Sequence, residues 1–336
     1  MRIILFIFFS CITFIVHTME KVEILHEDEK RTYLLFIPET HHNSYNLIVG
    51  LHGYSGSASG FQMETTGGFN QYAEEKGIIV AYPQGKYFYS ENKYLKSKTY
   101  TSSWNHLGPL IKSNPSIKIC EDVRTQSPVF PSCQNQDNCY WTSCVNDSDF
   151  IMKVTMLLHD RFSINNTYVM GLSNGGMMAQ LMGCTYPKLF DGVINIVGMQ
   201  PLGMSCIPKS PINLIIYGGA LDKSTPPKAI KTSSGYLYEP MLSTLNSWAN
   251  QFNCKDYKIS QLSEPFKTEE MMYFNCNNDV ILTSILNKEA GHSWPGITPN
   301  EGYCRTNIQS EIIYNECNDI SIISGSKYLF DRVFGE

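Results

Sequence analysis

Hydrophobic and polar positions along the chain fall into short apolar runs separated by amphipathic segments. Residues 21–37 contain two apolar stretches around a polar turn, which predicts two strands. The apolar runs at 46–53 and 78–85 each end in glycine, and such runs are typical of strands buried on both faces. The segment 69–77 has helical spacing and predicts a helix between those strands.

The second half of the chain continues this alternation. Residues 148–162 carry apolar residues at helical spacing, and Ser148 is the expected N-cap. Strands alternating with helices favour an α/β fold with a mostly parallel sheet and helices on both of its faces. The remaining predicted elements are strands at 167–173, 191–198, 212–219 and 280–286, and helices at 174–183, near 240–252 and at 327–334.

Residues 86–147 interrupt the alternation. This segment is polar, rich in aromatic residues and without obvious periodicity, which is unusual for so long a stretch inside a compact domain. We interpret it as a disulfide-stapled excursion at the carboxyl end of the sheet, where ligand sites of such sheets lie. A substrate-lining role and a passive surface loop are equally open. Its cysteines are Cys120, Cys133, Cys139 and Cys144.

Composition favours one globular domain over residues 19–336. The chain has 336 residues, of which 43% are hydrophobic and 17% charged, and no linker, repeat or low-complexity tract divides it. The formal net charge of −5 gives no reason to expect nucleic acid or an anionic membrane surface as a partner. The oligomeric state is not indicated.

The N-terminus predicts a secretory signal peptide over residues 1–18. Arg2 precedes an apolar run over 3–16, which is short for a membrane-spanning helix. We therefore expect a secreted, extracellular protein that is free of the membrane after cleavage, with an uncleaved anchor as the alternative. Sequons at Asn146 and Asn165 fit a glycosylated surface.

The cysteines indicate an oxidising compartment. Eleven cysteines less Cys11 of the signal leave ten, an even number that allows up to five disulfides. Cys254–Cys276 and Cys304–Cys317 are the local pairs we expect, although any one cysteine could be a buried free thiol. Neither C-x-x-C nor H-E-x-x-H spacing occurs, so we expect no metal site.

Ser173 lies in a G-x-S-x-G pattern between a predicted strand and a predicted helix. This is the nucleophile-elbow pattern, in which a tight turn holds the serine in a strained backbone conformation. Gly171 and Gly175 would let strand and helix approach closely, and the first N–H groups of the helix would point toward negative charge. We expect Ser173 to be a nucleophile; the alternative is a serine in an ordinary helix-start turn.

Chain order selects the partners of this serine. In this fold class the nucleophile is followed by an acid and then by a histidine. Of eight histidines, only His292 follows Ser173, which makes it the expected base. Asp222 is the first carboxylate after the strand at 212–219, where the orienting acid belongs. The rival carboxylates, none of which closely follows a buried strand, are Asp191, Asp256 and Asp279.

A glycine-rich loop at 51–61 supplies the remaining part of the expected site. Charge that forms on a substrate carbonyl oxygen needs two donors, one of them from the loop after an earlier strand. We expect these to be the backbone N–H groups of Tyr54 and Asn174. The alternative is that the Leu-His-Gly sequence is only a tight turn. This chemistry needs no cofactor.

Five segments together resemble one known family. LHGYSGSASGF, YPQG, GLSNGGMMAQLM, the aspartate after YGG, and GHSWPG are similar to the polyhydroxybutyrate depolymerase/feruloyl esterase-like family of secreted α/β-hydrolases, akin to carbohydrate esterase family 1. The likeness covers roughly residues 30–300 and implies the α/β-hydrolase fold, while the excursion at 86–147 matches no part of the pattern. The matched positions are Ser173, Asp222 and His292 for the triad, Tyr54 for the oxyanion loop and Trp294 for the tryptophan of H-x-W-P-G.

From the residues alone, Trp294 is expected only to pack or to form a pocket wall; the resemblance implies a substrate-binding role.

We therefore expect a secreted serine carboxylic-ester hydrolase acting through an acyl-enzyme. Soluble esters, such as feruloyl or acetyl groups on carbohydrate, are favoured because no linker to a binding module follows His292. A polyhydroxyalkanoate depolymerase is the first alternative, and a peptidase or thioesterase would use the same triad. A non-catalytic recognition domain on a hydrolase scaffold is a further alternative, disfavoured because all three triad positions carry competent residues.

Overall fold

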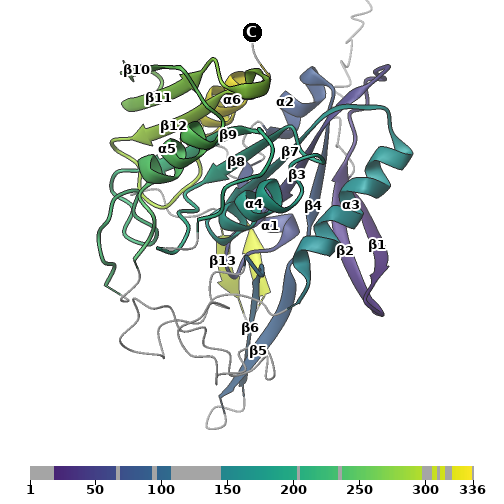
Figure 1. Ribbon diagram of the computed structural model, residues 1–336. Helices are drawn as coiled ribbons and strands as arrows, with labels where there is room; N and C mark the ends of the chain where they lie inside the picture. Colours follow the sequence, from purple (N-terminus) through teal and green to yellow (C-terminus); the bar gives the residue numbers. More distant parts are fainter. Residues whose placement is uncertain are drawn as a thin grey trace, which may run out of the picture.

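The computed structural model describes residues 19–65, 69–92, 97–106, 145–202, 205–233, 237–296, 305–308, 311–314 and 320–334. Within these ranges, one twisted sheet of ten strands crosses the molecule, with helices on both sides (Figure 1). In sheet order the strands are β1 (Glu20–His26), β2 (Glu29–Phe36), β4 (Ile78–Pro83), β3 (Tyr45–Leu51), β7 (Ile164–Leu172), β8 (Gly192–Ile196), β9 (Asn213–Gly219), β12 (Leu282–Asn287), β11 (Thr268–Phe274) and β10 (Asp256–Leu262).

The middle of the sheet is parallel, as the sequence predicts. The run β4-β3-β7-β8-β9-β12 pairs in parallel, while β1 and β2 on one side and β11 and β10 on the other are antiparallel. The central strands are apolar throughout because helices cover both faces. Every residue of β8, for example, is buried. The hairpin of β10 and β11 was not expected, because β10 is an exposed edge strand with a polar sequence.

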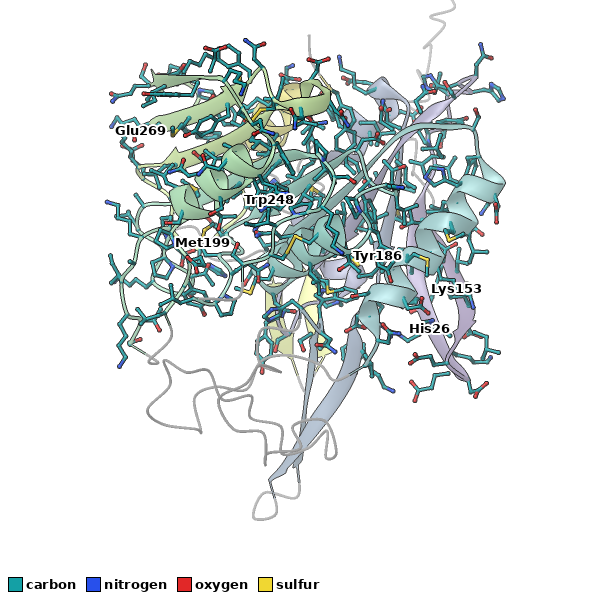
Figure 2. The ribbon with its side chains drawn as sticks, in the orientation of Figure 1. His26, Lys153, Tyr186, Met199, Trp248 and Glu269 are labelled. Carbon is teal, nitrogen blue, oxygen red and sulfur yellow. A yellow bond between two sulfur atoms is a disulfide. The ribbon has the colours of Figure 1, made fainter. Side chains whose placement is uncertain are left out.

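Side chains that alternate along each strand feed two hydrophobic cores. In β3, Leu47 and Val49 belong to one core and Ile48 to the other, as the two-residue period of a strand requires. On the first face lie α3 (Asp147–Arg161), α4 (Asn174–Thr185) and α5 (Met241–Gln251), the last packed through the fully buried Trp248 (Figure 2). The helices of the second face are α1 (Ala58–Thr65), α2 (Phe69–Lys76) and α6 (Ile320–Phe334).

Helix α3 begins differently from the sequence-based expectation. Its N-cap is Asn146, whose side-chain oxygen accepts a hydrogen bond from the Asp149 N–H at 3.3 Å, so the expectation of Ser148 is wrong. The helix can start earlier because the carboxylate of Asp147 turns inward to the guanidinium of Arg31, 2.8 Å away. Both side chains of this ion pair are buried.

The first part of the 86–147 segment has regular structure, contrary to the expectation. Strands β5 (Lys86–Asn92) and β6 (Ser97–Ser103) form an antiparallel hairpin that projects from the lower end of the molecule in Figure 1. A second small sheet pairs β13 (Arg305–Ile308) with β14 (Glu311–Tyr314). The four cysteines of the excursion lie outside the described residues, as does the predicted signal peptide.

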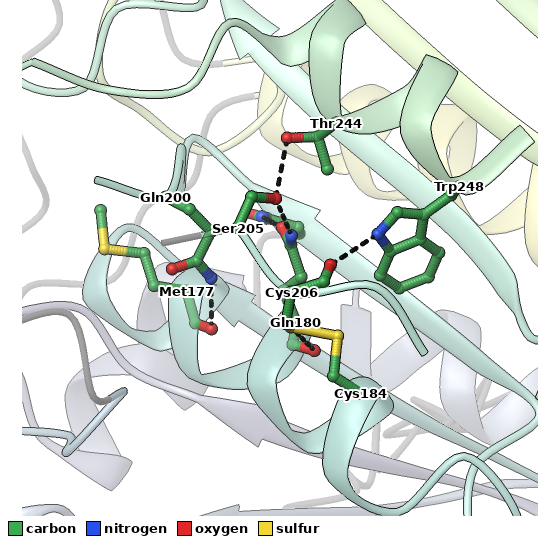
Figure 3. Close-up of a disulfide and its surroundings, with 9 residues drawn as sticks. Met177, Gln180, Cys184, Gln200, Ser205, Cys206, Thr244 and Trp248 are labelled. Carbon is green, nitrogen blue, oxygen red and sulfur yellow. Dashed lines mark hydrogen bonds between the residues drawn. A yellow bond between two sulfur atoms is a disulfide. The ribbon is translucent and has the colours of Figure 1, made fainter. Parts of the chain in front are cut away.

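Within the described part of the chain, two disulfides tie loops to the core. The predicted pair Cys254–Cys276 is confirmed and joins the end of α5 to the end of β11. A second disulfide, which the sequence did not single out, joins Cys184 in α4 to Cys206 in the loop after β8 (Figure 3). The expected pair of Cys304 and Cys317 lies outside the described residues.

Candidate active site

Ser173 lies at a sharp turn between β7 and α4. Its backbone has φ 57° and ψ −119°, a conformation that costs about 1–3 kcal/mol for a residue with a side chain. The flanking glycines are sterically required. A Cβ on Gly171 would lie 2.0 Å from the Gly175 carbonyl oxygen, and one on Gly175 would lie 2.2 Å from that of Leu51. The strained turn predicted from G-x-S-x-G is therefore present.

His292 lies in the loop after β12, beside this serine. Its Nε2 is 2.9 Å from the Ser173 hydroxyl oxygen, and its Nδ1 is 2.8 Å from a carboxylate oxygen of Asp222. The histidine side chain retains 19% of its exposure, whereas that of Asp222 is buried. The structure thus brings together the three side chains that chain order selected, from the carboxyl ends of β7, β9 and β12.

The carboxylate of Asp222 is held from several sides. One oxygen accepts backbone N–H bonds from Ser224 at 2.7 Å and Thr225 at 3.0 Å, and the other faces His292. Burial acts to raise the pKa of Asp222, but the hydrogen bonds from His292, Thr225 and Ser224 outweigh it and hold that pKa below its ordinary value. An ionised Asp222 can only accept, so the Nδ1 of His292 carries a proton and its Nε2 is left to accept from Ser173.

Thr225 is a member of the site that sequence reasoning missed. Its hydroxyl donates to the Val197 carbonyl oxygen at 2.6 Å, and it lies 3.1 Å from Asp222 Oδ2 and 3.3 Å from His292 Nδ1. It therefore ties the loop after β9 to the end of β8. The available signal was the spacing D-x-x-T after a strand, since an aspartate in a turn often bonds the N–H groups that follow it.

The rival carboxylates lie elsewhere. Asp191 accepts a hydrogen bond from the Thr167 N–H at 2.7 Å, just before β8 begins. It therefore lies at the amino-terminal ends of the parallel strands, whereas Ser173 lies at their carboxyl ends. Asp256 accepts a bond from the Asn275 side chain at 2.7 Å beside the hairpin of β10 and β11. Asp279 lies in a short 3-10 turn.

The glycine-rich loop after β3 abuts the serine. A Cβ on Gly53 would lie 3.6 Å from that of Ser173. The His52 ring bonds this loop to the segment after β4. Its Nδ1–H donates to the Gly53 carbonyl at 2.8 Å, and its Nε2 accepts a hydrogen bond from the Gly85 N–H at 3.0 Å. Burial lowers the pKa of His52 to about 4, which keeps the ring neutral and suits both bonds. Tyr54 follows directly in the same loop.

Asn174 is the first residue of α4. The first N–H groups of a helix have no acceptor within it, so the Asn174 N–H is positioned at the end of α4 that faces Ser173. The roles of Tyr54 and Asn174 as donors to a substrate oxygen stay a prediction.

Trp294 does not have the position that the resemblance implied. Its side chain has 0% exposure and packs edge-on against Phe61, with ring centroids 5.9 Å apart, and beside Phe330 at 6.4 Å. A tryptophan enclosed in the core between α1 and α6 offers no surface to a substrate. The substrate-binding expectation is therefore corrected to a packing role, one of the two that the residues alone allowed.

Comparison with known proteins identifies the fold. Acetylxylan esterase A of Emericella nidulans is 26% identical over 167 residues, which are 50% of this chain and 42% of that protein, so the match spans less than half of the relative. The solved acetyl xylan esterase from Aspergillus awamori superposes with a TM-score of 0.54 at 16% identity, over 83% of this chain and 95% of that one. No protein-family model matches. The chain has the α/β-hydrolase fold.

The described residues hold neither a cluster of three or more His, Cys, Asp or Glu suited to a metal ion nor a helix long and apolar enough to cross a membrane.

Proposed function

We propose that this chain is a serine carboxylic-ester hydrolase that removes acyl groups, acetyl foremost, from carbohydrate. The observation that carries the proposal is the hydrogen-bonded series from Ser173 through His292 to the buried Asp222, with distances of 2.9 and 2.8 Å. The strained backbone at Ser173 supports the same role, because such strain persists only where the surrounding structure imposes it.

Each step of the reaction follows from these contacts. The Ser173 oxygen bonds to the ester carbonyl carbon as its proton passes to Nε2 of His292, and Asp222 stabilises the cationic imidazole. The carbonyl oxygen, now negative, accepts hydrogen bonds from the N–H groups of Tyr54 and Asn174. The tetrahedral centre expels the alcohol oxygen, which takes the proton from Nε2. Water then attacks the acyl-serine by the same path and releases the acid.

The choice of substrate draws support from the relatives. Both the sequence relative and the solved structure bear the name of acetyl xylan esterase. A feruloyl group is the larger acyl group to compare, and a hydroxybutyrate oligomer stands for the polyester alternative. The disulfides Cys184–Cys206 and Cys254–Cys276 support secretion, because such bonds persist in oxidising compartments.

The test is turnover of acetylated xylan, methyl ferulate and a short hydroxybutyrate oligomer side by side, with 4-nitrophenyl acetate as the general ester. We expect the highest kcat/KM on acetylated xylan. Ser173→Ala should lose about 10⁵–10⁶-fold in kcat on every ester, as other hydrolases that lose this hydroxyl do. A phosphonate probe should label Ser173 in the wild type. Undiminished hydrolysis by folded Ser173→Ala would refute the mechanism, and preference for the oligomer would refute the substrate.

A further inference from the structure

Trp104 is a buried residue that contacts two segments next to Ser173, the loop after β3 and the start of α4. It directly follows β6, at the base of the 86–147 excursion, and has 0% exposure. Its backbone N–H donates a hydrogen bond to the side-chain oxygen of Asn174 at 2.7 Å. Its backbone carbonyl accepts one from the side-chain NH₂ group of Asn174 at 3.3 Å. Its indole N–H donates to the His52 carbonyl oxygen at 2.8 Å. One residue therefore joins two segments that are far apart in sequence.

These two segments are the ones that carry the predicted oxyanion donors. Asn174 is itself one donor, and His52 is two residues from the other, Tyr54. The indole of Trp104 also packs on the His52 imidazole, with ring centroids 4.9 Å apart. Trp104 thus bonds both the segment that carries the donor on α4 and the loop after β3.

The end of β6 strengthens this connection. The Ser55 N–H donates to the Ser102 carbonyl at 2.7 Å, and the Ser102 hydroxyl donates to the Gly56 carbonyl. Ser55 has a positive φ of 59°, so the loop adopts an unfavourable backbone conformation that these bonds help to maintain. The loop that contains Tyr54 is consequently bonded to Trp104 before that residue and to Ser102 of β6 after it.

The base of the excursion is in turn fixed to the core. The Asn105 N–H donates to Asp147 Oδ2 at 2.9 Å, and the Asn105 side chain donates to the Val145 carbonyl at 3.0 Å. Asp147 is the residue paired with buried Arg31. The residue that follows Trp104 is therefore bonded to the start of α3 and, through Asp147, to a buried ion pair.

We infer that Trp104 is a positioning residue for the oxyanion hole, setting the separation of the Tyr54 and Asn174 N–H groups. This inference rests on the proposed function and deepens it. Such donors stabilise a transition state only when they are already aimed at the place where charge develops, so a small displacement reduces the rate. The base of the excursion thus takes part in organising the site, whatever the remainder of 86–147 contacts.

The test is Trp104→Phe, assayed with 4-nitrophenyl acetate. Phenylalanine fills most of the buried site and keeps the backbone bonds to Asn174, but it removes the donor to the His52 carbonyl. We expect kcat to fall about tenfold, less than the roughly hundredfold or greater loss that follows removal of a whole oxyanion donor. KM and the pH profile should be unchanged because His292 and Asp222 are untouched. The inhibition constant of phenylboronic acid, which forms a tetrahedral anion on serine, should rise by the same factor as kcat falls.

Trp248→Phe is the matched control. Trp248 is equally buried and its indole N–H also donates to a backbone carbonyl, that of Cys206, at 2.9 Å. It should lose thermal stability to a similar degree while keeping kcat. The inference is overturned if Trp104→Phe keeps wild-type kcat, or if both variants lose kcat together. Should Trp104→Phe not fold, Ser102→Ala replaces it: about a threefold loss of kcat is expected, and no loss overturns the inference.

Failure of this inference can be told apart from failure of the proposed function. If the wild type is inactive on every ester, or Ser173→Ala is fully active, the hydrolase assignment fails. If the wild type is active, Ser173→Ala is inactive and Trp104→Phe equals the wild type, only the positioning role fails.

Discussion

Two polar networks border helix α4, and they are built differently. One is the series Ser173–His292–Asp222 at the start of the helix. The other, which we call the amide network, consists of Gln180, Asn195, Ser205 and Thr244 beside the disulfide Cys184–Cys206 (Figure 3). Each has hydrogen bonds of about the same length, so bond length alone does not distinguish a reactive site from a structural one.

The amide network contains no group that titrates. The Gln180 amide donates to Ser205 at 3.1 Å and its oxygen accepts from Asn195 at 3.0 Å, while Asn195 also bonds both backbone groups of Gly198. Gln180 and Asn195 are 1% exposed. A buried network whose members are mutually satisfied rigidifies the core and specifies one packing.

The series at Ser173 differs in three respects. It contains an ionised carboxylate, an imidazole that keeps 19% of its exposure, and a serine on a strained backbone. The strained backbone of Ser173 costs stability by itself, whereas the hydrogen bonds to the ionised Asp222 stabilise that carboxylate. The comparison teaches that exposure and strain, more than the presence of buried hydrogen bonds, separate the candidate active site from its structural neighbour.

After Ser173→Ala, the largest expected effect is that of Asp222→Asn on activity. The amide can still accept the Ser224 and Thr225 N–H bonds, so the fold should persist. It no longer enforces a proton on Nδ1 of His292, so kcat for 4-nitrophenyl acetate at neutral pH should fall about 10⁴-fold. Steady-state kinetics with a thermal melt measure both quantities. A near-normal kcat would mean that Asp222 is a structural group like the members of the amide network.

Loss of the disulfide beside the amide network should lower stability and leave kcat nearly unchanged. Changing both Cys184 and Cys206 to Ser opens a link across 22 residues of sequence, and the free energy of unfolding should fall by about 3 kcal/mol. The kcat per folded molecule should change less than about twofold, since neither cysteine contacts Ser173, His292 or Asp222. Urea unfolding and active-site titration provide the two numbers. A large loss of kcat with little loss of stability would contradict the comparison.

The sequence predicts a region well when the interactions that determine it are between residues close in sequence. Gly171, Ser173 and Gly175 reveal the elbow because the constraint is local, and an unbroken apolar run reveals a strand such as β8. The hairpin of β10 and β11 is missed because an edge strand needs little apolar sequence.

Long-range contacts are a harder case. Trp104 contacts residues 52 and 70 positions away, and nothing in its own neighbourhood signals those contacts. For Thr225 the local spacing D-x-x-T signals only the contact with Asp222 and not the one with His292, 67 positions away. Asp222 and His292 were found despite a similar distance because chain order in this fold class restricts the choices. At α3, Ser148 and Asn146 were both competent caps, and only the inward turn of Asp147 decided between them.

Two buried histidines, His52 and His106, make the stability of the fold depend on pH. His52 is buried with its pKa lowered to about 4, so the unfolded chain binds its proton more readily than the folded one. Stability from His52 is therefore full above about pH 6.5 and is lost as pH falls toward 4, by up to roughly 3 kcal/mol. Buried His106, with a pKa lowered to about 3, contributes with the same sign.

His52→Gln should make the free energy of unfolding depend less steeply on pH. Glutamine can both donate and accept but does not titrate in this range, so the dependence of the urea midpoint on pH between 6.5 and 4 should flatten relative to the wild type. An unchanged slope in His52→Gln would show that the ring is not held neutral by burial.

The smallest effect we predict concerns Thr225, which belongs to neither network fully. Its hydroxyl bonds the Val197 carbonyl like a structural group, yet it lies 3.3 Å from Nδ1 of His292. Thr225→Val keeps the shape and removes the hydroxyl, leaving the Val197 carbonyl without this bond; kcat should fall about fivefold as Asp222 and His292 lose a lateral support. Thr225→Ser restores the hydroxyl and should recover most of kcat. The contrary outcome is that Thr225→Val lowers the melting temperature but not kcat, and that Thr225→Ser restores the melting temperature. Thr225 would then have a structural role like the members of the amide network, and the active site would not extend beyond Asp222.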